Sequence, residues 1–118
     1  MNILKHIARK FGYAFKGLKI AITSDNSFKV HFLFAFPVVL SGFFLRFTRY
    51  EWITIIISIG FVLVAELFNT SIEYLVKMFT GEYHELAEKL LDISAGAVLM
   101  SSIMALVLAG FVYYPYVS

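Results

Sequence analysis

The sequence contains no cysteine, little charge and none of the common motifs of soluble enzymes. Without cysteine there is no disulfide, no thiolate nucleophile and no cysteine-ligated zinc site. The histidines His6, His31 and His84 lack metal-ligand spacing, so a transition-metal site is not expected. There is also no Walker A sequence, no kinase glycine loop and no GxSxG elbow. These absences argue against soluble NTPases, protein kinases and hydrolases.

Apolar side chains dominate what is present. They make up 60% of the 118 residues, charged residues make up only 15%, and the mean hydropathy is +0.81. A soluble domain has about 25% charged residues, so this composition indicates an integral membrane protein. A chain of this length forms one domain, 1–118. Because so few helices barely enclose a polar site, oligomers with sites shared between subunits are expected.

The pattern of apolar residues predicts an all-α membrane fold with four helices. Residues 2–23 place apolar side chains on one helical face and basic side chains on another, which predicts an amphipathic helix on the membrane surface. A turn and capping cluster at 23–27 follows it. Three membrane spans are expected over about 30–47, 52–79 and 93–114.

A polar stripe lies near the end of the uncharged part of the second span. At about 100° per residue, Glu66, Asn69 and Glu73 fall on one helical face, joined by Thr70 and Lys77. A charge in hydrocarbon costs roughly 3 kcal/mol on insertion scales, so an ionisable side chain here indicates a functional site. Two structural alternatives remain, in which Glu66 reaches up to the lipid headgroups and Asn69 joins neighbouring helices.

The distribution of charge predicts the orientation. Six basic residues precede the first span and two lie in the 46–51 connection, which places the N-terminus and the loop 77–92 in the cytoplasm. Acidic side chains then gather on the cytoplasmic side, and Glu66 lies just beneath them. These side chains are Asp25, Glu73, Glu82, Glu85, Glu88 and Asp92. Such a cluster suits Mg²⁺ that carries nucleotide phosphates. The asymmetric charge concerns the membrane, and nucleic acid is not an expected partner.

Three motifs carry a resemblance to a known family. They are Glu66-x-x-Asn69-x-x-x-Glu73, then Glu82-Tyr83-His84-Glu85-Leu86-Ala87, then Asp92-x-x-x-Gly96-Ala97-Val98-Leu99. Together they resemble the signature of the prokaryotic diacylglycerol kinase family, which includes undecaprenol kinases. The segments 13–19 and 28–29 match as well, so the resemblance covers almost the whole chain.

The resemblance implies a small enzyme with three spans and an N-terminal surface helix in the bacterial inner (cytoplasmic) membrane. Such enzymes are homotrimers with composite sites, and they use Mg-ATP to phosphorylate a lipid alcohol. By motif, Glu66 is the general base that takes the proton of the lipid hydroxyl, and Asn69 supports the site beside it. Asp25 and Glu73 hold Mg²⁺ and ATP. Further ATP contacts are expected from Tyr13, Glu82, Tyr83, His84 and Asp92.

Departures from the family pattern leave a second function open. Asp25 stands where the family usually has glutamate, and Leu91 replaces a lysine that would meet the ATP phosphates. Lys77 replaces a frequent aspartate, and Lys77 and Lys89 are possible phosphate contacts. The alternative is a catalytically degenerate, non-enzymatic membrane trimer of the same fold that binds lipid. No motif distinguishes diacylglycerol from undecaprenol.

Overall fold

The computed structural model describes residues 2–79 and 84–118. This part of the chain contains four helices, α1 (Ile3–Ser24), α2 (Ser27–Leu45), α3 (Arg49–Phe79) and α4 (Glu85–Val117). The last three are long and apolar enough to cross a membrane. The predicted all-α class with three membrane spans is therefore confirmed. The first helix is also found where it was expected, while its position on the membrane surface remains a prediction.

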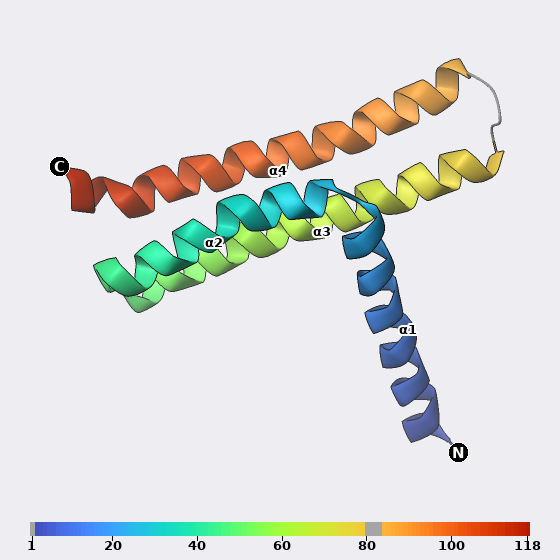
Figure 1. The fold of residues 1–118 in the computed structure, drawn as a ribbon, viewed down its shortest axis with the longest axis horizontal. Coiled ribbons are helices and arrows are strands. Elements are labelled where there is room, and N and C mark those ends of the chain that lie inside the picture. Colours follow the sequence, from blue (N-terminus) through green and yellow to red (C-terminus); the bar gives the residue numbers. More distant parts are fainter. Residues whose placement is uncertain (1, 80–83) are drawn as a thin grey trace.

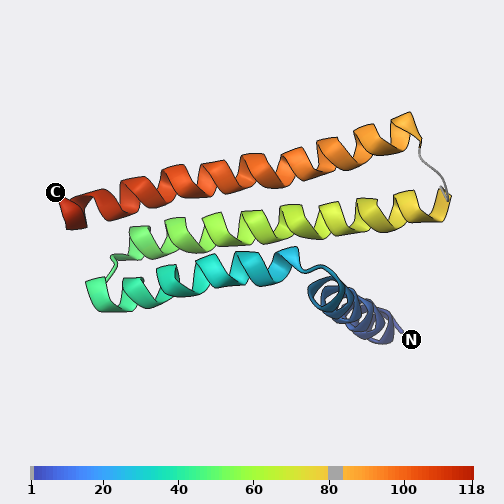
Figure 2. The ribbon, with the colours of Figure 1, turned by 45° about the horizontal axis from the view of Figure 1, so that its top comes forward.

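The three spanning helices lie side by side in one layer. Helix α3 lies between α2 and α4, and α1 leaves this layer at a steep angle (Figures 1 and 2). The Cα atoms extend over 53 × 46 × 19 Å, so the molecule is thin in one direction. A single layer leaves many of the large apolar side chains exposed.

A two-residue turn connects α1 to α2. The Asp25 carboxylate accepts a hydrogen bond of 2.9 Å from the backbone N–H of Ser27, and the Asp25 carbonyl accepts one of 3.2 Å from Phe28. Asp25 therefore satisfies the first free donors of α2, as the predicted capping cluster requires. The turn is shorter than expected, because α1 continues through Thr23, whose hydroxyl donates to the Lys19 carbonyl at 2.7 Å.

The connection between α2 and α3 is also shorter than the 46–51 segment predicted as polar. Arg46 ends α2 in the left-handed region, with φ 58°. Thr48 and Glu51 then form a capping box, in which Thr48 N–H donates to Glu51 Oε1 at 2.8 Å and Glu51 N–H donates to Thr48 Oγ1 at 3.2 Å. This reciprocal cap starts α3 at Arg49, three residues before the expected start.

Aromatic side chains join the three spans at the end where α3 begins. Phe47, Ile55 and Val112 are buried there, with Val38, Trp52 and Tyr113 packed against them. The ring of Phe47 lies 5.4 Å from Trp52 and 5.6 Å from Tyr113, centroid to centroid. We call these six residues the aromatic cluster. It forms the main apolar core of the described chain, at the opposite end of the layer from the polar stripe.

Helix α3 ends at Phe79, as predicted for the second span, and α4 begins at Glu85, ahead of the membrane span expected from 93. The physical reason is a cap, since His84 Nδ1 accepts a hydrogen bond of 3.1 Å from the backbone N–H of Leu86. The acidic residues from Glu85 to Asp92 therefore lie on the first turns of a long helix.

Candidate functional site

Glu66 is buried on α3, with 2% of its surface exposed. Its Oε1 lies 2.8 Å from His31 Nε2 on α2, and its Oε2 accepts a hydrogen bond of 3.2 Å from the Asn69 side-chain amide. An ionised carboxylate that is removed from water is stable only with such partners. Both oxygens of Glu66 are therefore held, one by a neighbouring helix and one by its own.

Asn69 is itself oriented by the third span. The Ser94 hydroxyl on α4 donates to Asn69 Oδ1. Because the carbonyl oxygen of the amide is engaged in this way, the amide nitrogen faces Glu66. His31, Glu66, Asn69 and Ser94 thus form one hydrogen-bonded chain across α2, α3 and α4, which we call the carboxylate network.

Thr70 connects this network to the turn between α1 and α2. Its hydroxyl lies 2.6 Å from Asp25 Oδ2 and 2.9 Å from the Glu66 carbonyl. The hydroxyl has one proton, and the shorter, charge-assisted bond to Asp25 is the stronger of the two. Thr70 is also only 5% exposed. The contact therefore fixes Asp25 beside Glu66, although the two residues lie far apart in the sequence.

Asp25 remains charged in this position. Burial opposes its charge, but the hydrogen bonds that its carboxylate accepts from Thr70 and Ser27 favour the charge, and the pKa of Asp25 lies below its ordinary value of 3.8. Asp25 and Glu66 also interact electrostatically. Two carboxyl groups at such close range favour the binding of a cation.

The donor set at this end of α3 fits Mg²⁺. Glu73 is half-buried and follows Thr70 by three residues, so it lies on the same helical face one turn further along. Within residues 2–79 and 84–118, no three acidic or histidine side chains converge tightly enough to hold a metal ion alone. Mg²⁺ does not require three, because it binds through one or two carboxylates and takes its other ligands from water and phosphate oxygens. Asp25 and Glu73 offer these hard oxygen donors.

Other predicted ATP contacts lie on separate parts of the chain. Tyr13 is exposed on α1, which points away from the spans (Figure 1). Asp92 is exposed on α4, and His84 caps that helix. Glu82 and Tyr83 lie outside the described residues. The structure thus brings Asp25, Glu66 and Asn69 together but does not gather Tyr13, His84 and Asp92 around them within one chain.

The two lysines that were predicted as possible phosphate contacts are engaged locally. The ammonium group of Lys77 lies 5.6 Å from the ring centroid of Tyr74. Lys89 lies 3.9 Å from the carboxylate of Glu85, one turn earlier on α4, and both side chains are mostly exposed. Such an exposed pair contributes little to stability, so Lys89 can leave it readily.

Sequence reasoning missed His31 and Ser94 as site residues. For His31 a signal was present, since it is the only titratable side chain between positions 30 and 45, in the middle of apolar residues. Ser94 carried no such signal, because hydroxyl side chains in membrane helices often bond to their own backbone. Only the packing of α3 against α4 shows that Ser94 reaches Asn69.

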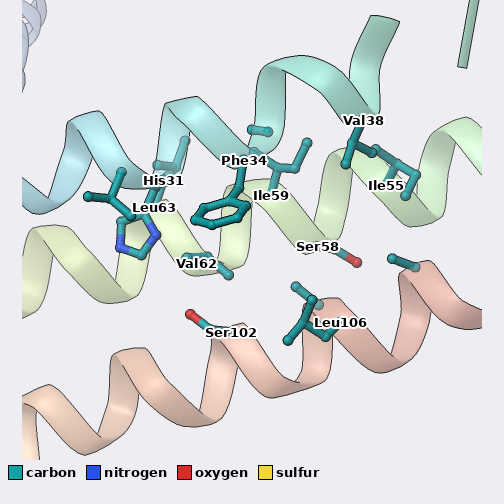
Figure 3. Close-up of a pocket in the computed structure, with 14 residues that line it drawn as sticks. His31, Phe34, Val38, Ile55, Ser58, Ile59, Val62, Leu63, Ser102 and Leu106 are labelled. Atoms are coloured by element: carbon teal, nitrogen blue, oxygen red, sulfur yellow. The ribbon is translucent and has the colours of Figure 1, made fainter. Parts of the chain in front are cut away.

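An apolar groove begins beside the carboxylate network. It has a volume of about 390 Å³ and lies between α2, α3 and α4. His31 stands at one end, and Phe34, Ile59 and Leu106 line the middle, as Figure 3 shows. The only polar side chains among its lining residues are His31, Ser58 and Ser102. The groove therefore offers an apolar path that ends at the partner of Glu66.

Comparison with known proteins covers nearly the whole chain. The model of a family described as prokaryotic diacylglycerol kinase matches residues 12–113. The undecaprenol kinase of Bacillus subtilis is 29% identical over 97% of this chain and 93% of its own length. The diacylglycerol kinase of Synechocystis is 30% identical over 97% of this chain and 66% of its own length. That of Escherichia coli K12 is 29% identical over 86% of this chain and 83% of its own length. The matched range includes Asp25, Glu66, Asn69 and Glu73.

Proposed function

The chain belongs to the prokaryotic diacylglycerol kinase family, and from this membership we propose that it transfers the γ-phosphoryl group of ATP, with Mg²⁺, to the hydroxyl of a membrane lipid alcohol. The related proteins named above are lipid kinases, so the lipid alcohol is diacylglycerol or undecaprenol. The observation that carries the proposal is the buried Glu66 carboxylate, which is held by His31 of α2 and Asn69 of α3 beside an apolar groove.

The position of Glu66 along the spans suits a lipid hydroxyl. Helix α2 has 19 residues, or about 28 Å at 1.5 Å per residue, which is close to the thickness of the hydrocarbon core. Its first residues lie level with Thr70, because Asp25 contacts Thr70 there. Glu66 is one turn deeper, just inside the membrane surface. A lipid whose hydrocarbon chain occupies the groove would present its hydroxyl at this depth.

The proposed reaction needs one proton acceptor and one group that neutralises phosphate charge. The lipid oxygen attacks the γ-phosphorus of ATP, its proton passes to the Glu66 carboxylate, and a P–O bond forms as the bond to the β-phosphate oxygen breaks and ADP leaves. Asp25 and Glu73 would hold Mg²⁺, which reduces the negative charge on the ATP phosphates. Asn69 keeps the Glu66 carboxylate in place.

We also propose that the site is completed in a homotrimer. A one-layer molecule with Tyr13 on a projecting helix does not surround a nucleotide with the residues expected to bind it. Copies placed side by side would bring Tyr13, His84 and Asp92 towards the carboxylates of a neighbour. Lys77 and Lys89 would then be available to contact the phosphates. The cationic N-terminal segment favours a cytoplasmic position for this end of the bundle, and we propose the inner membrane as its location.

The test is phosphate transfer from radiolabelled ATP to diacylglycerol and to undecaprenol in mixed micelles. We expect Glu66→Gln to reduce transfer by at least about 10²-fold, which is the usual contribution of a general base. Glu51→Gln is the matched control, because it makes the same change at the other end of α3 and a glutamine still serves in a capping box. Chelation of Mg²⁺ should abolish transfer.

Two outcomes would contradict the proposal. Equal activity of Glu66→Gln and wild type would remove Glu66 as the base. No transfer to either lipid by wild-type protein that is folded and trimeric would favour the degenerate alternative, in which Leu91 leaves the phosphates without their lysine.

A further inference from the structure

We propose that His31 is a positioning residue for Glu66, holding the carboxylate in the orientation in which it receives the proton of the lipid hydroxyl. The inference rests on the proposed role of Glu66 as the base, and it assigns a function to a side chain outside the motifs. It starts from the contact of 2.8 Å between His31 Nε2 and Glu66 Oε1.

The chemistry of the two groups determines which of them donates the proton of this hydrogen bond. A general base must be ionised, and an ionised carboxylate only accepts hydrogen bonds, so in the proposed role of Glu66 the proton of this bond belongs to His31 Nε2. The Asn69 amide donates to the other oxygen of Glu66. Each carboxylate oxygen can accept a further hydrogen bond, so both donors can remain in place while a substrate hydroxyl approaches.

Two donors on different helices restrict the carboxylate more than one does. The last torsion of a glutamate side chain is broad and has no steep preference of its own. Asn69 follows Glu66 by three residues on α3, so its amide moves with the same helix and would allow the carboxylate plane to rock. His31 lies on α2, and its bond adds a second point that is fixed independently. Together they define the plane in which the free lone pairs of Glu66 lie.

His31 contacts Glu66 and also lines the groove in which we propose that the lipid chain binds. Its side chain is 18% exposed. The same side chain lines the end of the apolar groove (Figure 3). A lipid chain in the groove would therefore pass His31 before its hydroxyl reaches the carboxylate. An imidazole is also costly among the apolar residues of α2, which favours a role beyond packing.

The test compares substitutions of His31 that differ in the reach of their donor. His31→Gln keeps an N–H donor near the position of Nε2, His31→Asn shortens that reach by one methylene, and His31→Leu removes the donor but keeps an apolar volume. We expect kcat to fall by about 10- to 10²-fold in the Asn and Leu variants, as for other small misplacements of a reacting group. The KM values for Mg-ATP and lipid should stay near wild type, and His31→Gln should recover most of kcat.

A merely structural role makes a different prediction. If His31 only joined α2 to α3, any variant with a normal unfolding midpoint would keep the wild-type kcat. Wild-type kcat in the Leu variant, or equal kcat in the Asn and Gln variants, would overturn the inference and leave the proposed function intact. No transfer by the wild type would overturn both. His6→Leu serves as the control for the loss of an imidazole, because His6 is exposed on α1.

Discussion

Replacement of Thr70 by valine isolates the contact that joins the α1–α2 turn to α3. Valine keeps the shape of threonine and replaces its hydroxyl with a methyl group. The change removes the 2.6 Å bond to Asp25 Oδ2 and leaves the packing of a side chain that is only 5% exposed. Asp25 keeps its hydrogen bond from the Ser27 backbone, so the variant should fold with a loosened turn.

The expected loss of stability lies between two general values. A hydrogen bond to a charged group contributes about 1.5–3 kcal/mol in soluble proteins. Side-chain hydrogen bonds between membrane helices contribute about 0.6 kcal/mol on average, and up to about 1.7 kcal/mol. Asp25 is only half-buried and can be solvated again in the variant, which argues for the lower range. We therefore expect Thr70→Val to lower the free energy of unfolding by about 1 kcal/mol.

The effect on activity should be larger than the effect on folding. If Asp25 helps to hold Mg-ATP, a loosened Asp25 raises the KM for Mg-ATP, and a loss of about 1.4 kcal/mol in binding corresponds to tenfold. The assays are unfolding in mixed micelles and lipid phosphorylation at varied Mg-ATP. Thr54→Val is the matched control, because Thr54 on the same helix donates to its own backbone, at the Tyr50 carbonyl. Equal stability and equal KM in the two variants would refute the reasoning, while Thr70→Ser should restore both.

Two more predictions test the packing. Gly42→Ala should lower the free energy of unfolding by about 1–3 kcal/mol, because an added Cβ would lie 2.6 Å from a ring atom of Trp52. An added Cβ at Gly60 would meet nothing within 4 Å, so Gly60→Ala should instead stabilise α3 by about 0.5–1 kcal/mol in the same unfolding assay. A Gly42→Ala variant more stable than Gly60→Ala would contradict this packing. Ala105→Trp should fill the groove and raise the KM for lipid without changing the KM for Mg-ATP. Leu99→Trp, on an exposed part of α4, is its control. Equal KM values for lipid in these two variants would show that the lipid chain does not bind in the groove.

Local patterns in the sequence predicted the helices and the polar face of α3. Helical periodicity depends on neighbouring residues alone, so the stripe of Glu66, Asn69 and Thr70 could be placed without a structure. The boundaries were less accurate, since they depend on caps. The box of Thr48 and Glu51 extends α3, and His84 starts α4 earlier than hydropathy indicates.

Contacts between helices could not be predicted in the same way. That His31 reaches Glu66, and Ser94 reaches Asn69, depends on the register of α2 and α4 against α3. Hydropathy does not specify this register, because most faces of a membrane helix are apolar. The resemblance to a family placed Asp25 near Glu73 by analogy, and the structure shows that Asp25 contacts Thr70, one turn before Glu73 on α3.

The two ends of α3 have different roles, since one end contributes mainly to stability and the other carries the candidate site. At the end where α3 begins, the aromatic cluster joins all three spans by close apolar packing. At the other end, the same spans meet through hydrogen bonds around Glu66, with the like charge of Asp25 beside it. Such an arrangement is poor for stability, because like charges repel and buried polar groups must find partners. It persists because the aromatic cluster holds the spans together independently. Substitutions in the carboxylate network should therefore change activity more than they change folding.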